Sequence, residues 1–471
     1  IDGEVAIINQ DIFIKKFAKS LRLGRAAAFL GAGMSSGAGY VDWKDLLKDV
    51  AIELDLDVTK EDDLISLAQY YVSYKQNKKS LVEAIIENIN TNKNPTITHE
   101  ILASLPLDTY WTTNYDDLIE KALINKNKRI DIKRRDKDLL YPIKGSDAVI
   151  YKMHGDIIFS SDAVISKEDY ELYQETHGSM LNVLKGDLTT KSFLFMGYSF
   201  NDPDLIDLLA RIRCMVGEEK QEHYAIMREV NENEYNTQEE YDYAKKKRTL
   251  QNKDFLRYGI EIIEIKEYSD IASILRKIAI QVNKENIFIS SAIADSHFEE
   301  FDESLLRGIV KSLLELSDES RIISGYGLNI GSIIIDETMQ YLKTNKHFKL
   351  EEKLKLYPFA LGSPEDWTKY RNLMLNDTGV CILLYGTKEK DGRIINSSGM
   401  KEEFEIAHRN GALIVPVGST GGMSLEIANH LIKENYYVDD LNYLREETDS
   451  QKLVNKITAI VCKNKDNVEK E

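Results

Sequence analysis

The sequence predicts an α/β protein made of two Rossmann-like domains, each a doubly wound parallel sheet, with a helical insertion in the first. Its 471 residues exceed the size at which single cores usually stop growing, roughly 250 to 300 residues. Short apolar runs alternate with stretches of helical periodicity, which is typical of parallel sheets with crossover helices. This pattern starts afresh near residues 283–286. We therefore expect domains over residues 1–283 and 284–471.

The first domain opens with the apolar run AAAFL at residues 26–30, which enters the glycine-rich segment GAGMSSGAGY. Apolar residues then recur at helical spacing from Trp43, so a strand, a loop and a helix are expected. Residues 62–102 carry the same spacing and predict the helical insertion. Further strands are expected at residues 109–113, 148–153, 192–196, 224–227 and 260–265.

The second domain begins with the expected strand NIFISSAI, then a helix over 299–316, the strand RIIS and the loop GYGLNIGS. Later elements alternate in the same way and predict a second parallel sheet. The expected strands span 380–385 and 412–418, and the expected helices span 364–376, 400–409 and 425–434.

Charge and cysteine content exclude several classes of protein. The net charge of −17, without a local basic patch, argues against nucleic acid as a partner. Cys214, Cys381 and Cys462 are far apart and predict neither a disulfide framework nor a zinc site, which fits a reducing cytoplasm. No apolar run approaches the roughly 20 residues needed to span a bilayer. We expect a cytoplasmic protein that uses no nucleic acid, membrane or metal ion.

Glycines follow the first expected strand, where a backbone can approach a pyrophosphate closely. Gly31, Ala32 and Gly33 lie between a strand and a helix, and the amides at a helix N-terminus favour phosphate. Ser35 adds a hydroxyl that can hydrogen-bond the ligand. Taken alone, these glycines fit a tight structural turn equally well.

Asn114 and His154 follow two other expected strands, and open α/β sheets bind ligands at the carboxyl ends of their strands. Taken alone, Asn114 would be the N-cap of a helix beginning at Tyr115, and His154 a satisfied structural residue. A histidine exposed at a strand end, however, titrates near neutrality and can accept a proton from water. The segment GYSFNDP at residues 197–203 again joins a strand to a helix and can close a nucleotide pocket.

The segments GAGMS, TTNYD, MHGD and GYSFNDP, in this order and spacing, resemble the NAD⁺-binding domain of the sirtuin family. The resemblance implies that His154 is the general base and that Asn114 orients the nicotinamide ribose or the attacking water. The expected dinucleotide-binding residues are Gly31, Ala32, Gly33, Ser35, Asp116, Gly197, Ser199 and Asp202.

Two departures from the protein-deacylating sirtuins narrow the expected reaction. The chain has no CxxC motif for a zinc module, and the loop after GAGMS lacks their Pro-Asp-Phe-Arg segment. The likeness is therefore to the bacterial branch that hydrolyses NAD⁺ to nicotinamide and ADP-ribose. NAD⁺ would be the substrate, with no prosthetic group and no metal.

The second domain offers a separate set of candidate ligand contacts. Gly325 and Gly327 lie in a strand-to-helix loop, Arg371 and Lys388 can balance phosphate charge, and Glu403 can accept bonds from ribose hydroxyls. Each alone is more often a surface residue. With its partner domain, this half resembles the SLOG nucleotide sensors of Thoeris antiphage effectors.

That resemblance covers nearly the whole chain and implies gating and assembly. A cyclic ADP-ribose isomer, made by a TIR-domain partner enzyme, would bind the SLOG domain through Arg371, Lys388 and Glu403 and activate the NADase. The resemblance also implies a homotetramer that can stack into filaments. Two alternatives stay open: a deacylase or ADP-ribosyltransferase, and a non-catalytic nucleotide sensor that signals by assembly.

Overall fold

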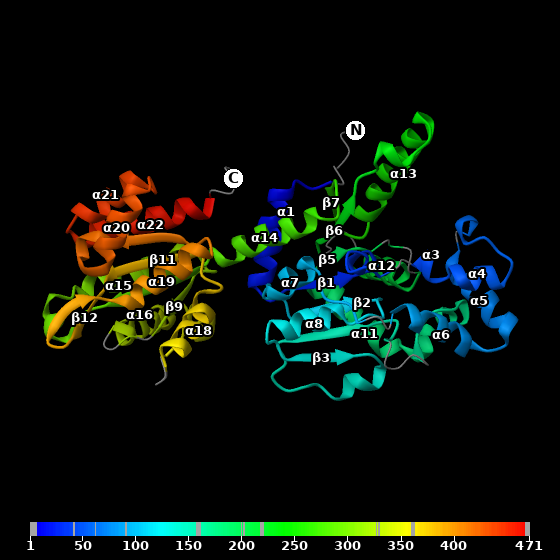
Figure 1. The fold of residues 1–471 in the computed structure, drawn as a ribbon, viewed down its shortest axis with the longest axis horizontal. Helices are drawn as coiled ribbons and strands as arrows, with labels where there is room; N and C mark the ends of the chain where they lie inside the picture. The colour runs from blue at the N-terminus through cyan, green and yellow to red at the C-terminus, as the bar shows by residue number, and fades with distance from the viewer. Residues whose placement is uncertain are drawn as a thin grey trace. The chain divides into compact units, whose positions relative to one another are not determined.

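The computed structural model describes residues 7–40, 43–61, 63–89, 92–156, 162–198, 200, 203–216, 221–325, 327, 330–358 and 363–466. The chain divides into two compact units, Ile1–Ala279 and Ile280–Glu471. The division falls within α14 (Asp270–Asn283), whose last residue is also the last of the first predicted domain. Each unit has its own parallel sheet (Figure 1).

The first unit is built on a seven-stranded parallel sheet. The strands in spatial order are β3 (Ile130–Lys133), β4 (Ala148–Lys152), β2 (Thr109–Thr112), β1 (Ala26–Leu30), β5 (Ser192–Met196), β6 (His223–Arg228) and β7 (Ile260–Ile265). The chain moves outward from β1 to β2 and returns to place β5 on the other side of β1, so the sheet is doubly wound. Every residue of β1 and β5 is buried, as strands covered on both faces require. The predicted fold class is confirmed for this domain.

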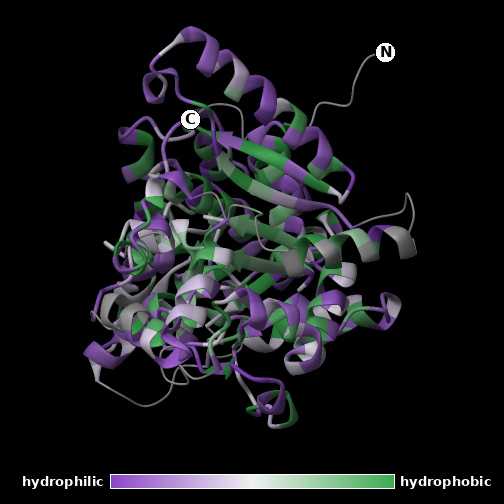
Figure 2. Cartoon of the chain, turned by 90° about the vertical axis from the view of Figure 1, so that its right-hand side faces the viewer, coloured by the Kyte–Doolittle hydropathy of each residue, from purple (hydrophilic) through white to green (hydrophobic). Residues whose placement is uncertain are grey.

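Helices accompany these strands in the alternation expected from the sequence. They are α1 (Gln10–Arg22), α2 (Gly33–Ser36), α7 (Ile97–Ser104), α8 (Leu118–Asn125), α9 (Lys167–Glu171), α10 (Tyr173–Thr176), α11 (Gly178–Thr190), α12 (Pro203–Val216), α13 (Gln238–Leu256) and α14. Single 3₁₀ turns occur at η1 (Val58–Lys60), η2 (Asp136–Leu140) and η4 (Glu232–Glu234). Figure 2 shows strands coloured toward hydrophobic among helices that carry many hydrophilic residues.

The helical insertion has a small core of its own. It consists of α3 (Trp43–Leu46), α4 (Lys48–Glu53), α5 (Leu64–Lys75) and α6 (Lys78–Ile89). Leu47, Leu67 and Leu81 are fully buried in this core, which Ala163 and Ile165 join from the segment after β4. The insertion begins earlier than the expected residue 62, and α7 lies outside it because α7 packs against α8.

The second unit has a five-stranded parallel sheet. Its strands in spatial order are β10 (Leu354–Leu356), β9 (Arg321–Ser324), β8 (Asn286–Ala292), β11 (Val380–Tyr385) and β14 (Leu413–Val417). Strand order reverses between β8 and β11, so this sheet is also doubly wound and the predicted class is confirmed again. A separate hairpin is formed by β12 (Thr387–Lys390) and β13 (Arg393–Asn396).

The helices of the second unit pack in two groups beside this sheet. α15 (Glu303–Leu316) contacts both α16 (Ile330–Thr344) and α22 (Ser450–Asp466), whereas α18 (Pro364–Leu375) contacts α19 (Ser398–Arg409). The remaining elements are α17 (Leu350–Lys353), α20 (Gly422–Lys433), α21 (Val438–Glu446), η5 (Asp295–Glu300) and η6 (Gly418–Thr420). In the part of the chain that the structure describes, no helix has both the length and the apolar character to cross a membrane.

Sequence patterning missed β3, β10, β12 and β13. β3 alternates apolar and charged residues, but its buried positions hold Asp131 and Lys133 rather than isoleucine. These two side chains form an ion pair, with 2.9 Å between Lys133 Nζ and Asp131 Oδ2. β10 has only three residues, and β13 is exposed throughout. A search for apolar periodicity cannot find a strand whose buried positions are charged, or a strand that is too short or too exposed to have a buried face.

Candidate active site

Four loops that carry predicted site residues leave the same edge of the first sheet. β4, β2, β1 and β5 are adjacent and parallel, so their carboxyl ends meet at that edge. The loops hold the glycine turn at residues 31–33, Asn114, His154 and Gly197. Outside the described residues lie two of the predicted positions, Ser199 and Asp202.

The glycines of two of these loops interlock backbone against backbone. The Gly33 N–H donates to the Gly197 carbonyl at 2.9 Å. A Cβ atom on Gly31 would lie 2.4 Å from the Gly197 oxygen, and one on Gly197 would lie 2.3 Å from the Met34 nitrogen. Gly197 also has a φ of +63°, which side chains rarely adopt. Glycine is therefore required here for close packing of the two loops, whatever else it does.

The amides of the glycine turn are largely engaged within the protein. Besides the Gly33 bond, the Met34 N–H donates to Gly31 O and the Ser35 N–H to Ala32 O, both at 3.0 Å. The helix that follows, α2, is only four residues long. The predicted role of this turn in holding a pyrophosphate stays a prediction, and it would need these amides to exchange partners.

Asn114 is held by hydrogen bonds to the glycine turn. Its Nδ2 donates to Gly31 O and to Ser35 Oγ, each at 3.0 Å, and its backbone N–H donates to Thr112 Oγ1 at 2.9 Å. Ser35 Oγ donates in turn to Asp116 Oδ2 at 2.6 Å. Four predicted residues from two loops thus form one network. With Nδ2 committed, the amide oxygen is the group of Asn114 suited to accept a bond from a ligand hydroxyl.

The simpler reading of Asn114 as a helix cap is wrong. α8 begins at Leu118, not at Tyr115, and the Leu118 N–H donates to Asp116 Oδ1 at 3.1 Å. Asp116 therefore makes the bond to the start of this helix that Asn114 would make as a cap.

His154 is buried, which corrects the expectation of an exposed ring. Only 6% of the residue is accessible. Its ring meets Tyr170 and Tyr173 edge-on, with centroids 5.4 and 6.2 Å away. The backbone is held as well, because Tyr173 Oη donates to Met153 O at 2.9 Å and the Val164 N–H donates to His154 O at 3.1 Å. Aromatic neighbours and backbone bonds thus fix the ring's direction.

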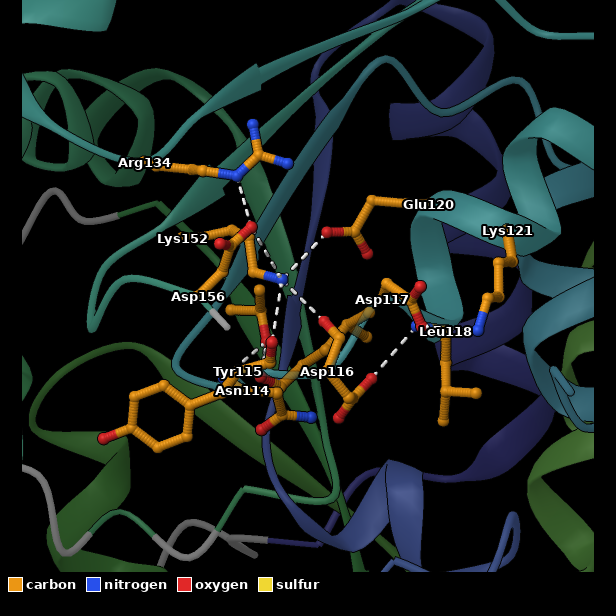
Figure 3. Close-up of polar contacts among 12 residues, drawn as sticks. Asn114, Tyr115, Asp116, Asp117, Leu118, Glu120, Lys121, Arg134, Lys152 and Asp156 are labelled. Atoms are coloured by element: carbon orange, nitrogen blue, oxygen red, sulfur yellow. Dashed lines mark hydrogen bonds and ion pairs between the residues drawn. The ribbon is translucent and has the colours of Figure 1, made fainter. Parts of the chain in front are cut away.

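A cluster of buried charges close to Asn114 is absent from the sequence predictions (Figure 3). Lys152, the last residue of β4, is fully buried, and its Nζ lies 2.9 Å from Glu120 Oε1. Asp156 lies 3.8 Å from the same Nζ and pairs with Arg134. Burial raises the pKa of Glu120. One signal was available, because alternation in AVIYK places Lys152 on the buried face of β4 with Ala148.

In the second unit, the structure brings Arg371 and Glu403 together. Arg371 Nη1 lies 2.6 Å from Glu402 Oε2, and its Nε lies 3.6 Å from Glu403 Oε1. Ser290 Oγ donates to Glu403 Oε2 at 2.6 Å. Burial raises the pKa of Glu403, against the opposing effects of Ser290 and Arg371. The cation predicted to bind phosphate is thus already neutralised by carboxylates.

The other predicted contacts of this unit lie in the loop after β9 and on the β12–β13 hairpin. Gly327 lies beside β8, since a Cβ atom on it would be 3.7 Å from Ser291 O. Gly325 directly follows β9. Lys388 is on β12, and its Nζ donates to Ser398 Oγ at the start of α19 at 2.7 Å. α19 also carries Glu403, so one helix connects the predicted lysine and the predicted carboxylate.

A cavity of about 450 Å³ opens at the ends of β8, β11 and β14. Its walls include Asp302, Tyr385 and Thr387, together with the 419–422 loop that follows β14. Arg371, Lys388 and Glu403 are not among its lining residues.

Comparison with known proteins covers both units. Residues 108–257 match the SIR2-like domain family, and residues 270–464 match STALD, the Sir2- and TIR-associating SLOG family. The NAD(+) hydrolase ThsA of Cytobacillus dafuensis is 39% identical over 455 residues, which cover 92% of this chain and 90% of that protein. The proteins of the same name from Acinetobacter baumannii and Bacillus cereus are 37% and 38% identical, over 96% and 91% of this chain and 98% and 91% of their own.

This chain belongs to the NAD(+) hydrolase ThsA family. The predicted resemblance, a sirtuin-like domain followed by a SLOG domain, is confirmed in identity and order. A more distant relative, defense-associated sirtuin 2 of Bacillus subtilis, is 28% identical over 209 residues, which cover 42% of this chain and 20% of that protein. Among the described residues, no group of three or more His, Cys, Asp or Glu side chains could hold a metal ion.

Proposed function

We propose that the chain hydrolyses NAD⁺ to nicotinamide and ADP-ribose at the edge of the first sheet. One observation carries the proposal: Asn114 bonds both Gly31 of the glycine turn and Ser35, which in turn bonds Asp116. Four residues expected to bind a dinucleotide or act on it thus share one network, at the sheet edge where His154 follows the neighbouring strand β4. The names of the family's members, NAD(+) hydrolase, support the same reaction.

The chemistry needs little from the protein beyond positioning. Departure of nicotinamide leaves an oxocarbenium-like ribosyl centre, so a held and polarised water is worth more than a strong acid. In this proposal the Asn114 amide orients the ribose or the water, and His154 accepts the water proton. Fixed rings at Tyr170 and Tyr173 keep the His154 imidazole in one direction.

We further propose that the SLOG domain gates this reaction by binding a cyclic ADP-ribose isomer supplied by a TIR-domain enzyme. The phosphates would meet Arg371 and Lys388, and Glu403 would accept ribose hydroxyls. The family description as Sir2- and TIR-associating supports such a pairing. Gating requires that the activator bind the active conformation more tightly than the resting one. To shift the ratio of active to resting protein from 1:99 to 99:1, the two binding free energies must differ by about 5.5 kcal/mol.

The test is nicotinamide release from NAD⁺ by the purified full chain, with and without a cyclic ADP-ribose isomer. Asn114→Ala should abolish release. Asn125→Ala, at the exposed end of α8, is the matched control and should keep it, because its side chain contacts only Glu100 among the bonds described. Full turnover by Asn114→Ala would overturn the proposal. ADP-ribose found attached to an added acceptor would favour transfer over hydrolysis.

The proposed assembly has its own measurement. We expect a homotetramer in light scattering, with longer particles when the activator is added. Activator-dependent assembly without any nicotinamide release would favour a non-catalytic sensor over the hydrolase.

A further inference from the structure

We propose that Lys152 is a positioning residue that holds the Asn114 loop in register with His154. The inference rests on the proposed function, because it assigns Lys152 a part in the same reaction. Its basis is the contacts of one buried ammonium group, drawn in Figure 3.

The Lys152 ammonium bonds the loop that carries Asn114. Nζ donates to Asp116 O at 2.5 Å and lies 3.4 Å from Tyr115 O. These are the carbonyls of the two residues that follow Asn114. A third bond runs to Glu120 Oε1 in the first turn of α8, at 2.9 Å. An ammonium has three donors, and here they converge on one loop and the helix that follows it.

The same lysine is tied by the chain to His154, two residues further on. β4 pairs with β2. The N–H of Met153, the residue between Lys152 and His154, donates to Thr112 O at 2.9 Å. The backbone between Lys152 and the histidine is therefore held to β2 by this bond. The Asn114 loop is then held from two sides, by Gly31 and Ser35 through the Asn114 side chain and by Lys152 through the carbonyls.

A purely structural role explains this arrangement less well. Burying a charge costs desolvation free energy, and apolar side chains of similar volume often stabilise a core as well as a buried ion pair does. Lys152 is completely buried and Glu120 is 5% exposed. Burial raises the pKa of the Glu120 carboxyl, as expected where the attraction of Lys152 offsets only part of the desolvation penalty. What an apolar pair could not supply is the bond to the loop carbonyls.

The chain contains a matched pair for comparison. Lys133 on β3 is also buried, lies 2.9 Å from Asp131 and donates to two loop carbonyls, Asp138 O at 2.9 Å and Tyr141 O at 3.0 Å. Its loop carries none of the residues assigned to NAD⁺. Removing either lysine together with the charge of its carboxylate partner thus deletes a buried ion pair and two bonds to loop carbonyls, once beside Asn114 and once at the sheet edge.

The experiment compares three variants of the full chain in activated nicotinamide release. Lys152→Met/Glu120→Gln removes the ammonium and leaves no unpaired charge on Glu120. Its kcat should fall by about 10- to 100-fold with KM for NAD⁺ changed less than about 3-fold, because small misplacements of reacting groups cost rates of this order. Glu120→Gln alone keeps the carbonyl bonds and should stay within about 3-fold of wild type, as should Lys133→Met/Asp131→Asn.

Hydrogen exchange supplies a readout that does not depend on activity. Amides of residues 112–118 should exchange faster in Lys152→Met/Glu120→Gln than in Glu120→Gln, with no such change in Lys133→Met/Asp131→Asn. If the first double variant does not fold, Lys152→Leu/Glu120→Leu is measured in its place. A folded double variant with the kcat and loop exchange of Glu120→Gln would overturn the role of Lys152. A silent wild type would instead overturn the proposed function.

Discussion

The two predicted sites hold their polar groups in opposite ways. In the first unit, Asn114 is fixed by bonds to Gly31 and Ser35, and the neighbouring charges are buried. In the second unit, Arg371 faces Glu402 and Glu403, so its charge is balanced by side chains rather than by backbone. Neutral hydrogen bonds favour a preorganised site, whereas an arginine held by carboxylates can exchange one anion for another. The difference is the one expected between a reaction centre and a sensor.

The largest expected effect tests whether the first site is a reaction centre. His154→Gln should lower kcat for nicotinamide release by about 10² to 10⁴-fold, because glutamine fills similar space but cannot act as a base near neutral pH. Circular dichroism should show an intact fold. An unchanged rate would make His154 a packing residue and remove the contrast between the two units.

The close packing of the two glycine loops in the first site can be tested by substituting Gly197. Gly197→Ala should destabilise the chain by about 3 to 5 kcal/mol, from a left-handed backbone and a backbone clash together. Gly24→Ala is the matched control, since Gly24 has the same φ of +63° but open space around it. It should cost only about 1 to 2 kcal/mol. If Gly197→Ala and Gly24→Ala lowered the thermal midpoint equally, the interlocked loops would be able to move apart and accommodate the added methyl group.

Exchange of partners in the second site can be tested by removing either charge. Arg371→Ala should raise the activator concentration for half-maximal release by about 10- to 100-fold, the loss of one or two charge-assisted bonds. Glu402→Gln should lower that concentration a few-fold, because it frees Arg371 from its 2.6 Å partner. Nicotinamide release titrated with the cyclic nucleotide measures both. Normal activation of Arg371→Ala would refute this placement of the ligand.

The smallest expected effect is a pH dependence from Glu403. Burial raises the pKa of this carboxyl above its ordinary 4.5, so its protonated form is favoured in the folded state. The stability it contributes is present below pH 4.5 and is lost as pH rises through the raised pKa. The thermal midpoint of Glu403→Gln should therefore rise relative to that of the wild type as pH rises from 4 to about 7. A constant difference between the two midpoints across this range would show that Glu403 has the same pKa in the folded and unfolded states.

Much of the fold could be read from the residues alone, for identifiable reasons. Strands such as β1 and β11 are buried on both faces, so they appear as continuous apolar runs. The glycine turn could be found because it comes directly after such a strand, and Asn114 because it follows the β-rich run TYWTT. β3 could not, since its inner face carries Asp131 and Lys133.

Sequence by itself determined the doubly wound class, the division into two domains and the strand ends at which Asn114 and His154 would be sought. These follow from local periodicity, which a single chain displays without any knowledge of its contacts. Only the tertiary structure decided that His154 is buried, that Lys152 bonds the Asn114 loop and that Arg371 is already paired with Glu402. Burial and ion pairing depend on which side chains come into contact from strands and helices that are far apart in the chain, so only the tertiary structure can show them.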